Sequence, residues 1–369
     1  MSSQKHHFEP LTWLRGIAAF LVVISHSLRA TQDTYFEKDE PVNWLVLRIL
    51  DLGTFGVLLF FTLSGTTLYL SHTKQSNQLN VMSFYIKRFF RIWPAFAVSL
   101  MVYFAFSFVF RSLYGEPSGH WIERQFLQLP SAVDFFAYLT LSFNISGQLG
   151  LFNNAYWSLP VEFQYYLLFP IIILLLPVLK SLSPILMGIA LYLAFKLDLG
   201  LLSDSRMLML GFTFCGGVFL GYIYRAYVFH LNQYIGTFIF IFLLSCASIV
   251  TNQFVNIPNV PVLSNTWIML GLIALAVVAV ILFSEIKLPK FITNQFFKLG
   301  EFSYSFYLYH NLFIGCAVLF LIQFNIVDAA LRYLVVIMIG GVLSLYVAYK
   351  SYLHVELPFM KIGSKIANR

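Results

Sequence analysis

Long apolar stretches alternate with short polar ones along almost the whole chain. A window of about 20 residues, the length of a helix that crosses the hydrocarbon core of a bilayer, finds ten such stretches. An open strand edge would leave backbone groups unpaired in lipid, and the long apolar runs lack the alternation of a β-barrel strand. The pattern therefore predicts an all-α, polytopic membrane protein of about ten transmembrane helices, forming a single membrane-embedded domain over residues 1–369. The expected spans are 12–30, 53–71, 92–111, 156–178, 184–201, 207–227, 234–251, 265–284, 302–323 and 331–353.

The composition agrees with a protein that has lipid as its solvent. Of the 369 residues, 59% are hydrophobic and only 11% are charged. A soluble globular protein carries about 25% charged residues to keep its surface hydrated. The soluble class is therefore excluded, and the lipid bilayer is the first expected partner.

Basic residues gather on one side of the predicted membrane. If the N-terminus is cytoplasmic, the cytoplasmic segments carry fifteen of the 23 basic residues, and the outer segments carry eleven of the sixteen acids. By the positive-inside rule, both termini are expected in the cytoplasm, which suits an even number of spans. The net charge of +7 then reflects topology, and we expect no nucleic-acid partner.

The first span carries two ionisable residues, Arg15 and His26. Eleven helical residues make three turns plus roughly 20°, so both side chains lie on one face, about 16 Å apart along the axis. An ionisable side chain within a membrane helix is a candidate functional residue, because burying it without a partner costs free energy. The alternative is an interfacial anchor at Arg15 and a histidine that only packs against other helices.

Arg88 and Arg91 lie three residues apart, where the third span meets the cytoplasm. They share a helix face, and two guanidinium groups can each donate a forked pair of hydrogen bonds to a phosphate. The pattern is typical of a phosphate site. It is equally typical of a positive-inside anchor.

Glu162 lies near the outer end of the fourth span. Counted from the outer boundaries, Glu162 and His26 fall at similar depths, roughly 9 and 6–7 Å. A carboxylate that orients an imidazole makes histidine an effective base, so we predict that the two side chains meet. In the alternative interpretation, Glu162 pairs with an arginine and holds helices together.

The ninth span carries a polar stripe. Ser303, Tyr307 and His310 share one helix face, with Tyr304 and Asn311 beside them. The stripe is expected to face the inside of the bundle, where it either lines a substrate channel or links helices.

Two further patterns predict structure rather than chemistry. Gly217 and Gly221 form a Gly-x-x-x-Gly pair on the sixth span, which is typical of close helix packing. Residues 121–129 are amphipathic and lie in an outer loop, so we expect an interfacial helix on the outer leaflet.

Several separate segments together resemble integral-membrane acyltransferase family 3. Each is degenerate alone, but their order and spacing across nearly the whole chain are specific. The segments are LTWLRGIAA at 11–19 running on to His26, FFTLSG at 60–65, RFFRIWP at 88–94, WSLPVE at 157–162, SYSFYLYH at 303–310 and SYLHVELP at 351–358. Thr66, where an aromatic residue is usual, and Pro160 depart from the family pattern.

The resemblance implies a helical enzyme that moves an acyl group, commonly acetyl, from cytoplasmic acyl-CoA to a hydroxyl. The acceptor would be a cell-surface or lipid-linked glycan, and the membrane would be the bacterial cytoplasmic (inner) membrane. The family's pattern on the first helix maps onto Arg15 and His26, and its arginine pair maps onto Arg88 and Arg91. Acyl-CoA is expected as the donor substrate, and no metal is expected.

A mechanism follows from these expectations. Arg88 and Arg91, with Arg15, would bind the CoA phosphates at the cytoplasmic mouth, and His26, assisted by Glu162, would deprotonate the acceptor. The polar stripe would line the path of the thioester arm. A covalent acyl-histidine is an alternative.

Two other classes of function remain open at this point. One is a proton-coupled transporter or flippase that uses His26, Glu162 and His310 as a relay. The other is a scaffold or receptor without catalysis, which would leave His26 without a role.

Overall fold

The structure is a computed structural model that describes residues 9–31, 49, 51–72, 79–114, 121–126, 130–146, 149–198, 204–227, 229–255, 262–326 and 328–368. These residues form helices joined by short connections, with one isolated β-bridge between Leu231 and Ser284. Nine helices in this part of the chain are long and apolar enough to cross a membrane. The prediction of an all-α polytopic protein is confirmed.

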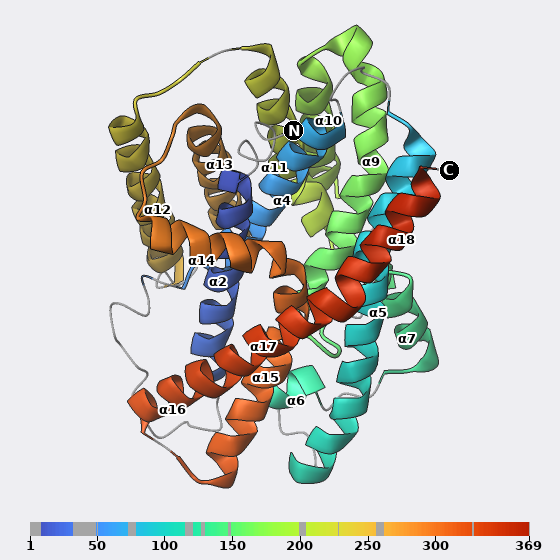
Figure 1. Cartoon of the computed structure of the whole chain (residues 1–369). Helices are drawn as coiled ribbons and strands as arrows, with labels where there is room; N and C mark the ends of the chain where they lie inside the picture. Colours follow the sequence, from blue (N-terminus) through green and yellow to red (C-terminus); the bar gives the residue numbers. More distant parts are fainter. Residues whose placement is uncertain are drawn as a thin grey trace.

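Each predicted span coincides with a helix (Figure 1). The fifth, α10, has only 15 residues, about 22 Å of helix, and is the shortest of the ten. The helices are α2 (Glu9–Thr31), α4 (Gly53–His72), α5 (Val81–Tyr114), α9 (Ser158–Leu179), α10 (Leu182–Lys196), α11 (Arg206–Ala226), α12 (Gln233–Val255), α13 (Val262–Phe283), α15 (Ser303–Gln323) and a last helix that begins with α16 (Ala329–Val335).

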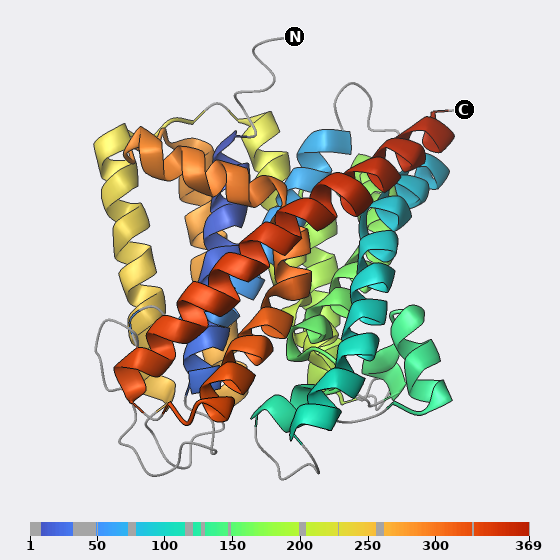
Figure 2. The same cartoon turned by 60° about the horizontal axis from the view of Figure 1, so that its bottom comes forward.

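Both ends of the described chain lie on one side of the molecule (Figure 2). Helix α2 begins there, and the last helix ends there. This agrees with the even number of spans; that this side faces the cytoplasm stays a prediction from the distribution of basic residues. The short helix α6 (Trp121–Phe126) lies on the opposite side (Figure 2). Helix α7 (Ala132–Leu139) lies beside α5, where Trp93 donates to the backbone oxygen of Leu139 (2.8 Å), and α8 (Phe143–Ser146) follows it.

Small residues bring the central helices together. A Cβ atom at Gly217 of α11 would lie 2.1 Å from the backbone oxygen of Thr62 on α4, and one at Gly221 would lie 3.0 Å from the Tyr69 ring. The prediction of close packing at this Gly-x-x-x-Gly pair is confirmed. In the same way, Gly16 of α2 lies against α14 (Lys290–Glu301), a short helix that the span prediction missed.

The last helix is longer than predicted. It continues from α16 through η3 (Val336–Gly341), α17 (Val342–Ser351) and η4 (Tyr352–Glu356) to the end of α18 (Leu357–Ala367), so it runs well beyond residue 353. It crosses one face of the bundle obliquely (Figure 2). Both η3 and η4 are π-helical turns, and both lie beside α15. A π-turn inserts an extra residue and shifts the contact face of a helix. The last helix packs on α15 along η3 and α17, and its final part, α18, packs on α5.

Helix α5 begins at Val81, eleven residues before the predicted span. Pro94 lies inside it without ending it, because neighbouring helices in a membrane protein can compensate the missing backbone bond. Arg88 and Arg91 are therefore part of a continuous helix, on its third turn.

The predicted interfacial helix at 121–129 exists as α6, and residues 127–129 lie outside the described residues. Ile122 and Phe126 are fully buried, and the Phe126 ring stacks on Tyr103 of α5 at 5.8 Å. Phe126 also lies against Gly315 of α15. The helix is thus packed against protein rather than laid on lipid.

Residues 149–157, here called the inner segment, fold back into the bundle before α9. Asn153, Ala155 and Tyr156 are fully buried, and the Asn153 side chain donates to the backbone oxygen of Leu308 (3.1 Å). The η2 turn (Asn154–Trp157) then leads directly into α9. Helix α9 therefore starts inside the protein and not at its outer surface.

Candidate active site

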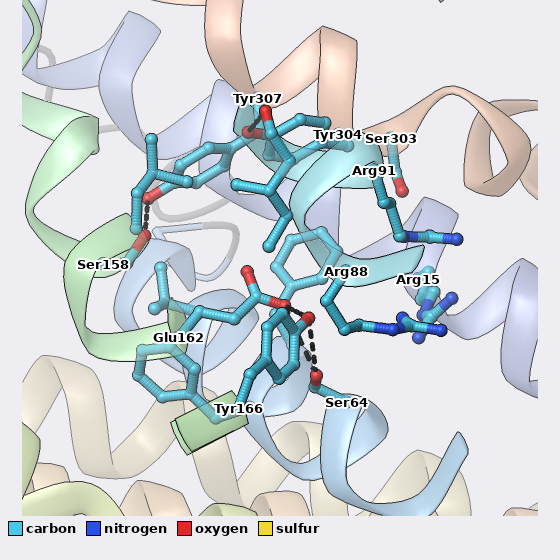
Figure 3. Close-up of a pocket in the computed structure, with 15 residues that line it drawn as sticks. Arg15, Ser64, Arg88, Arg91, Ser158, Glu162, Tyr166, Ser303, Tyr304 and Tyr307 are labelled. Carbon is cyan, nitrogen blue, oxygen red and sulfur yellow. Dashed lines mark hydrogen bonds between the residues drawn. The ribbon is translucent and has the colours of Figure 1, made fainter. Parts of the chain in front are cut away.

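Five helices surround a small cavity of about 60 Å³, here called the arginine pocket. It opens between α2, α4, α5, α9 and α15, and Figure 3 shows its side chains. The guanidinium groups gather on one side, and Tyr307 and Ser158 lie on the other. The lining residues are Arg15, Val57, Phe60, Phe61, Ser64, Arg88, Arg91, Ile92, Ser158, Leu159, Glu162, Tyr166, Ser303, Tyr304 and Tyr307.

The three predicted arginines meet in this pocket. Arg15 donates to the hydroxyl of Thr67 (2.7 Å), and the Arg88 guanidinium lies against the rings of Tyr166 and Phe84, 5.8 and 6.0 Å from their centroids. The Nε atom of Arg88 is buried and has no hydrogen-bond partner within the described part of the chain. A buried donor without an acceptor is costly in free energy, so the pocket favours a ligand that supplies a hydrogen-bond acceptor to Arg88.

Glu162 is the one carboxylate in the lining. Its Oε1 accepts a hydrogen bond from the hydroxyl of Tyr166 and lies 3.3 Å from Ser64 Oγ. Counted formally, three guanidinium groups and one carboxylate give the lining a net charge of about +2. The pocket is therefore suited to an anion with more than one negative charge.

The predicted meeting of Glu162 and His26 is wrong. Helix α4 runs antiparallel to α2, so that Gly53 lies against Ser25 while Thr67 binds Arg15. Ser64, the neighbour of Glu162, is eleven residues along α4 from Gly53, or about 16 Å from the level of His26. The prediction assumed that α9 starts at the outer surface, whereas the inner segment carries its first turn deep into the protein.

His26 instead contacts a second histidine. Its Nδ1 lies 2.7 Å from Nε2 of His310, and the two rings are nearly parallel, with centroids 5.0 Å apart. His310 is fully buried, whereas His26 keeps part of its surface exposed. The pair lies near the outer end of α2, where Arg29 and Asp51 approach within 3.8 Å of each other.

The polar stripe on α15 is divided between these two places. Ser303 and Tyr307 line the arginine pocket, as does Tyr304. His310 binds His26, and Asn311 donates to the Asn153 side chain (2.8 Å), which pins the inner segment to α15. The stripe therefore links helices at His310 and Asn311 and lines a pocket at Ser303 and Tyr307. That it lines a substrate channel stays a prediction.

Tyr307 lies between the arginine pocket and the histidines. Its hydroxyl is 2.6 Å from the backbone oxygen of Ala155 and 2.7 Å from Ser158 Oγ, and its ring centroid is 5.7 Å from that of His310. The inner segment and α15 therefore meet at this side chain.

Sequence reasoning did not assign Tyr166, Ser64 or Ser158 to the site, although all three line the pocket, nor Thr67, which accepts a hydrogen bond from Arg15. Tyr166 follows Glu162 by four residues and so shares its helix face, which could have indicated the contact. Thr67 is separated from Arg15 by 52 residues, and no pattern in the chain links them.

The family model of acyltransferase family 3, described as an acyltransferase domain, matches residues 9–352. The chain belongs to this family. Membership of this family favours acyl transfer over the transporter and scaffold alternatives.

The chain is also similar to individual relatives. "Acyltransferase MdmB" of Streptomyces mycarofaciens is 31% identical over 163 residues, which is 44% of this chain and 38% of the relative. "Putative O-acetyltransferase SACOL0978" of Staphylococcus aureus (strain COL) and "Putative O-acetyltransferase SA0834" of strain N315 are each 25% identical over 354 residues, 86% of this chain and 54% of the relative. The chain therefore spans about half the length of the two Staphylococcus aureus relatives, and the match covers a smaller share of the Streptomyces relative. No solved structure matches the chain.

Proposed function

We propose that this acyltransferase moves an acyl group, in the simplest case acetyl, from cytoplasmic acyl-CoA to a hydroxyl of a cell-surface or lipid-linked glycan. The observation that carries the proposal is the placement of two different sites along α2. The arginine pocket surrounds Arg15 near the cytoplasmic end, and the exposed side of His26 lies about 16 Å further towards the outside. Donor and acceptor would then approach from opposite sides.

The arginine pocket supports a phosphate-bearing donor. Its net charge of about +2 and the unpaired Nε of Arg88 favour a polyanion over a neutral ligand. Arginine is also the side chain whose planar fork matches phosphate oxygens. The phosphates of acyl-CoA would bind here, and the pantetheine arm would extend past Tyr307 towards His26.

His26 would act as the general base. It accepts the proton of the acceptor hydroxyl while that oxygen attacks the thioester carbonyl carbon; the C–S bond then breaks, and the protonated His26 returns the proton to the CoA thiolate. One ester and one thiol form, and no proton is left over. The exposed part of His26 gives the acceptor access that the fully buried His310 lacks.

Glu162 takes a different role from the one that its position in the sequence favoured. Held by Tyr166 and Ser64 among the arginines, it would orient these cations and prevent their mutual repulsion in the empty pocket. It would act on the donor and not on the base.

Oriented vesicles test the proposal. The purified protein is reconstituted, acetyl-CoA with a labelled acetyl group is supplied on the cytoplasmic face alone, and a saccharide acceptor is enclosed on the other face. We expect the label to become ester-linked to the acceptor, and vesicles with His26→Ala to give none. Label on the acceptor only when both substrates share the cytoplasmic side would contradict the outward acceptor site. Acceptor carried across intact, with no new ester, would contradict the proposal as a whole.

The proposed setting is a bacterial cytoplasmic membrane. The helical bundle supports a multi-pass membrane protein, and the relatives named above come from bacteria. Comparison of the surface glycans of a deletion strain with those of its complemented parent would identify the acceptor.

A further inference from the structure

We infer that His310 is a positioning residue for acyl transfer, because it fixes the proton of His26 on Nδ1 and leaves Nε2 of His26 free as the base. This inference rests on the proposed function, in which His26 is the base. The inference adds to the mechanism a second histidine, His310, that does not contact the substrate. It also defines which nitrogen donates in the hydrogen bond between the two histidines.

The direction of the hydrogen bond between the two histidines is set by His310, the more deeply buried of the two. Nδ1 of His310 lies 2.8 Å from the backbone oxygen of Tyr307. A carbonyl oxygen can only accept, so Nδ1 of His310 carries a hydrogen. In the neutral ring, Nε2 of His310 then bears the lone pair.

The same logic carries over to His26. Because Nε2 of His310 is an acceptor, the 2.7 Å contact requires that Nδ1 of His26 donates. The remaining nitrogen of neutral His26, Nε2, must bear the lone pair. This is the tautomer that a general base requires, and here a chain of two hydrogen bonds selects it.

The burial of the two rings agrees with this division of roles. His310 is fully buried, and its backbone oxygen lies 3.4 Å from Ser344 Oγ of α17, so the last helix holds it from behind. His26 is only partly buried, so part of its surface stays accessible. When His26 gains a proton on Nε2, its Nδ1–H bond to His310 becomes charge-assisted and stabilises the cation.

Two substitutions of His310 separate positioning from simple packing. His310→Phe keeps a flat ring of similar size but has no acceptor for the Nδ1 hydrogen of His26. His310→Gln keeps an acceptor oxygen on a side chain of similar reach. We expect kcat to fall by about 10²–10⁴-fold in the Phe variant, the cost of a wrong tautomer or a lost base, with the KM for acyl-CoA nearly unchanged. The Gln variant should recover about tenfold or more of the lost kcat. His230→Phe, at an exposed histidine before α12, is the matched control.

A spectroscopic measurement on the wild-type protein gives a second test that does not depend on how the variants fold. Nitrogen NMR of histidine-labelled protein in lipid nanodiscs, assigned with the His26→Ala spectrum, should show His26 protonated on Nδ1 and bare on Nε2. A proton on Nε2 of His26, or a folded His310→Phe variant with kcat within about threefold of wild type, would overturn the inference. Retained transfer by His26→Ala would instead overturn the role of His26 in the proposed function.

Discussion

Arg15 and His26 share one face of α2, yet the structure gives them unrelated partners. Their spacing could be predicted from the sequence, because a helix fixes the relative positions of residues on its own surface. Their partners, Thr67 and His310, come from other helices, 52 and 284 residues away. Local periodicity carries no information about such contacts. The predicted partner of His26, Glu162, was therefore wrong, whereas His26 stays a candidate catalytic residue.

The role of His26 gives the first prediction. His26→Ala should lower the rate of acyl transfer by about 10²–10⁴-fold, the usual contribution of a general base, while the protein still inserts into membranes. Ester formation with purified variants in detergent measures it. His230→Ala, an exposed histidine outside the bundle, should behave like wild type. Wild-type product levels from well-expressed His26→Ala would remove His26 from the mechanism.

The arginine pair gives the second prediction. Arg88→Lys and Arg91→Lys keep the charge but lose the planar fork, and a hydrogen bond between charged groups is worth about 1.5–3 kcal/mol. Each variant should therefore weaken acyl-CoA binding by about tenfold or more in a calorimetric titration. Arg111→Lys, at the outer end of the same helix, is the control. If the double variant binds acyl-CoA like wild type, the two residues are only membrane anchors.

The third prediction distinguishes the two roles considered for Glu162. Glu162→Gln keeps the side-chain shape and a carbonyl oxygen that can accept the Tyr166 hydrogen bond. Because Glu162 lies among the arginines, the change should alter the apparent affinity for the donor and leave the transfer rate at saturating donor within a few-fold of wild type. Steady-state kinetics over a range of donor concentrations separates these quantities. A loss of kcat as large as that of His26→Ala would indicate instead that Glu162 assists His26, the proposed base.

At the scale of elements, hydropathy located every span but not every helix end. The window found apolar lipid-facing runs, and it therefore stopped at residue 92 in α5 and at residue 353 in the last helix. Both helices continue where their sequences become more polar. The inner segment was missed for a related reason. Non-helical backbone can lie within a membrane protein only where other protein surrounds it, and hydropathy does not show which segments are surrounded.

A glycine contact between elements gives the fourth prediction. Alanine normally favours a helix over glycine by about 1 kcal/mol, so Gly→Ala should stabilise an open site. At Gly217 the added carbon would meet the α4 backbone at 2.1 Å, and overpacking of this kind costs about 1–3 kcal/mol. We expect Gly217→Ala to lower the thermal unfolding temperature in detergent. Gly341→Ala, where nothing lies within 4 Å, should leave it unchanged or raise it. Equal effects of the two changes would contradict the packing role of Gly217.

At the scale of the whole molecule, the bundle places a cationic cavity and a histidine pair at different depths. Sequence motifs indicated the residue types at both places, since a family resemblance covers nearly the whole chain. They could not indicate that Glu162 belongs to the arginine pocket, because its depth depends on how far the inner segment enters the bundle. The arginine pocket and the histidine pair consequently have separate polar residues, with Tyr307 between them.

The position of Tyr307 also bears on the electrical tightness of the membrane. Each proton that crosses a 100 mV potential dissipates about 2.3 kcal/mol. A continuous aqueous path through the bundle would therefore dissipate the transmembrane proton gradient. Tyr307, hydrogen-bonded to Ala155 and Ser158, lies between the arginine pocket and the histidine pair that contains the partly exposed His26. Vesicles with Tyr307→Gly should therefore lose an imposed pH gradient faster than wild type, as measured by an enclosed pH-sensitive dye. Tyr346→Gly, at an exposed position on α17, is the control, and equal leak rates would show that insulation against proton flow lies elsewhere in the bundle.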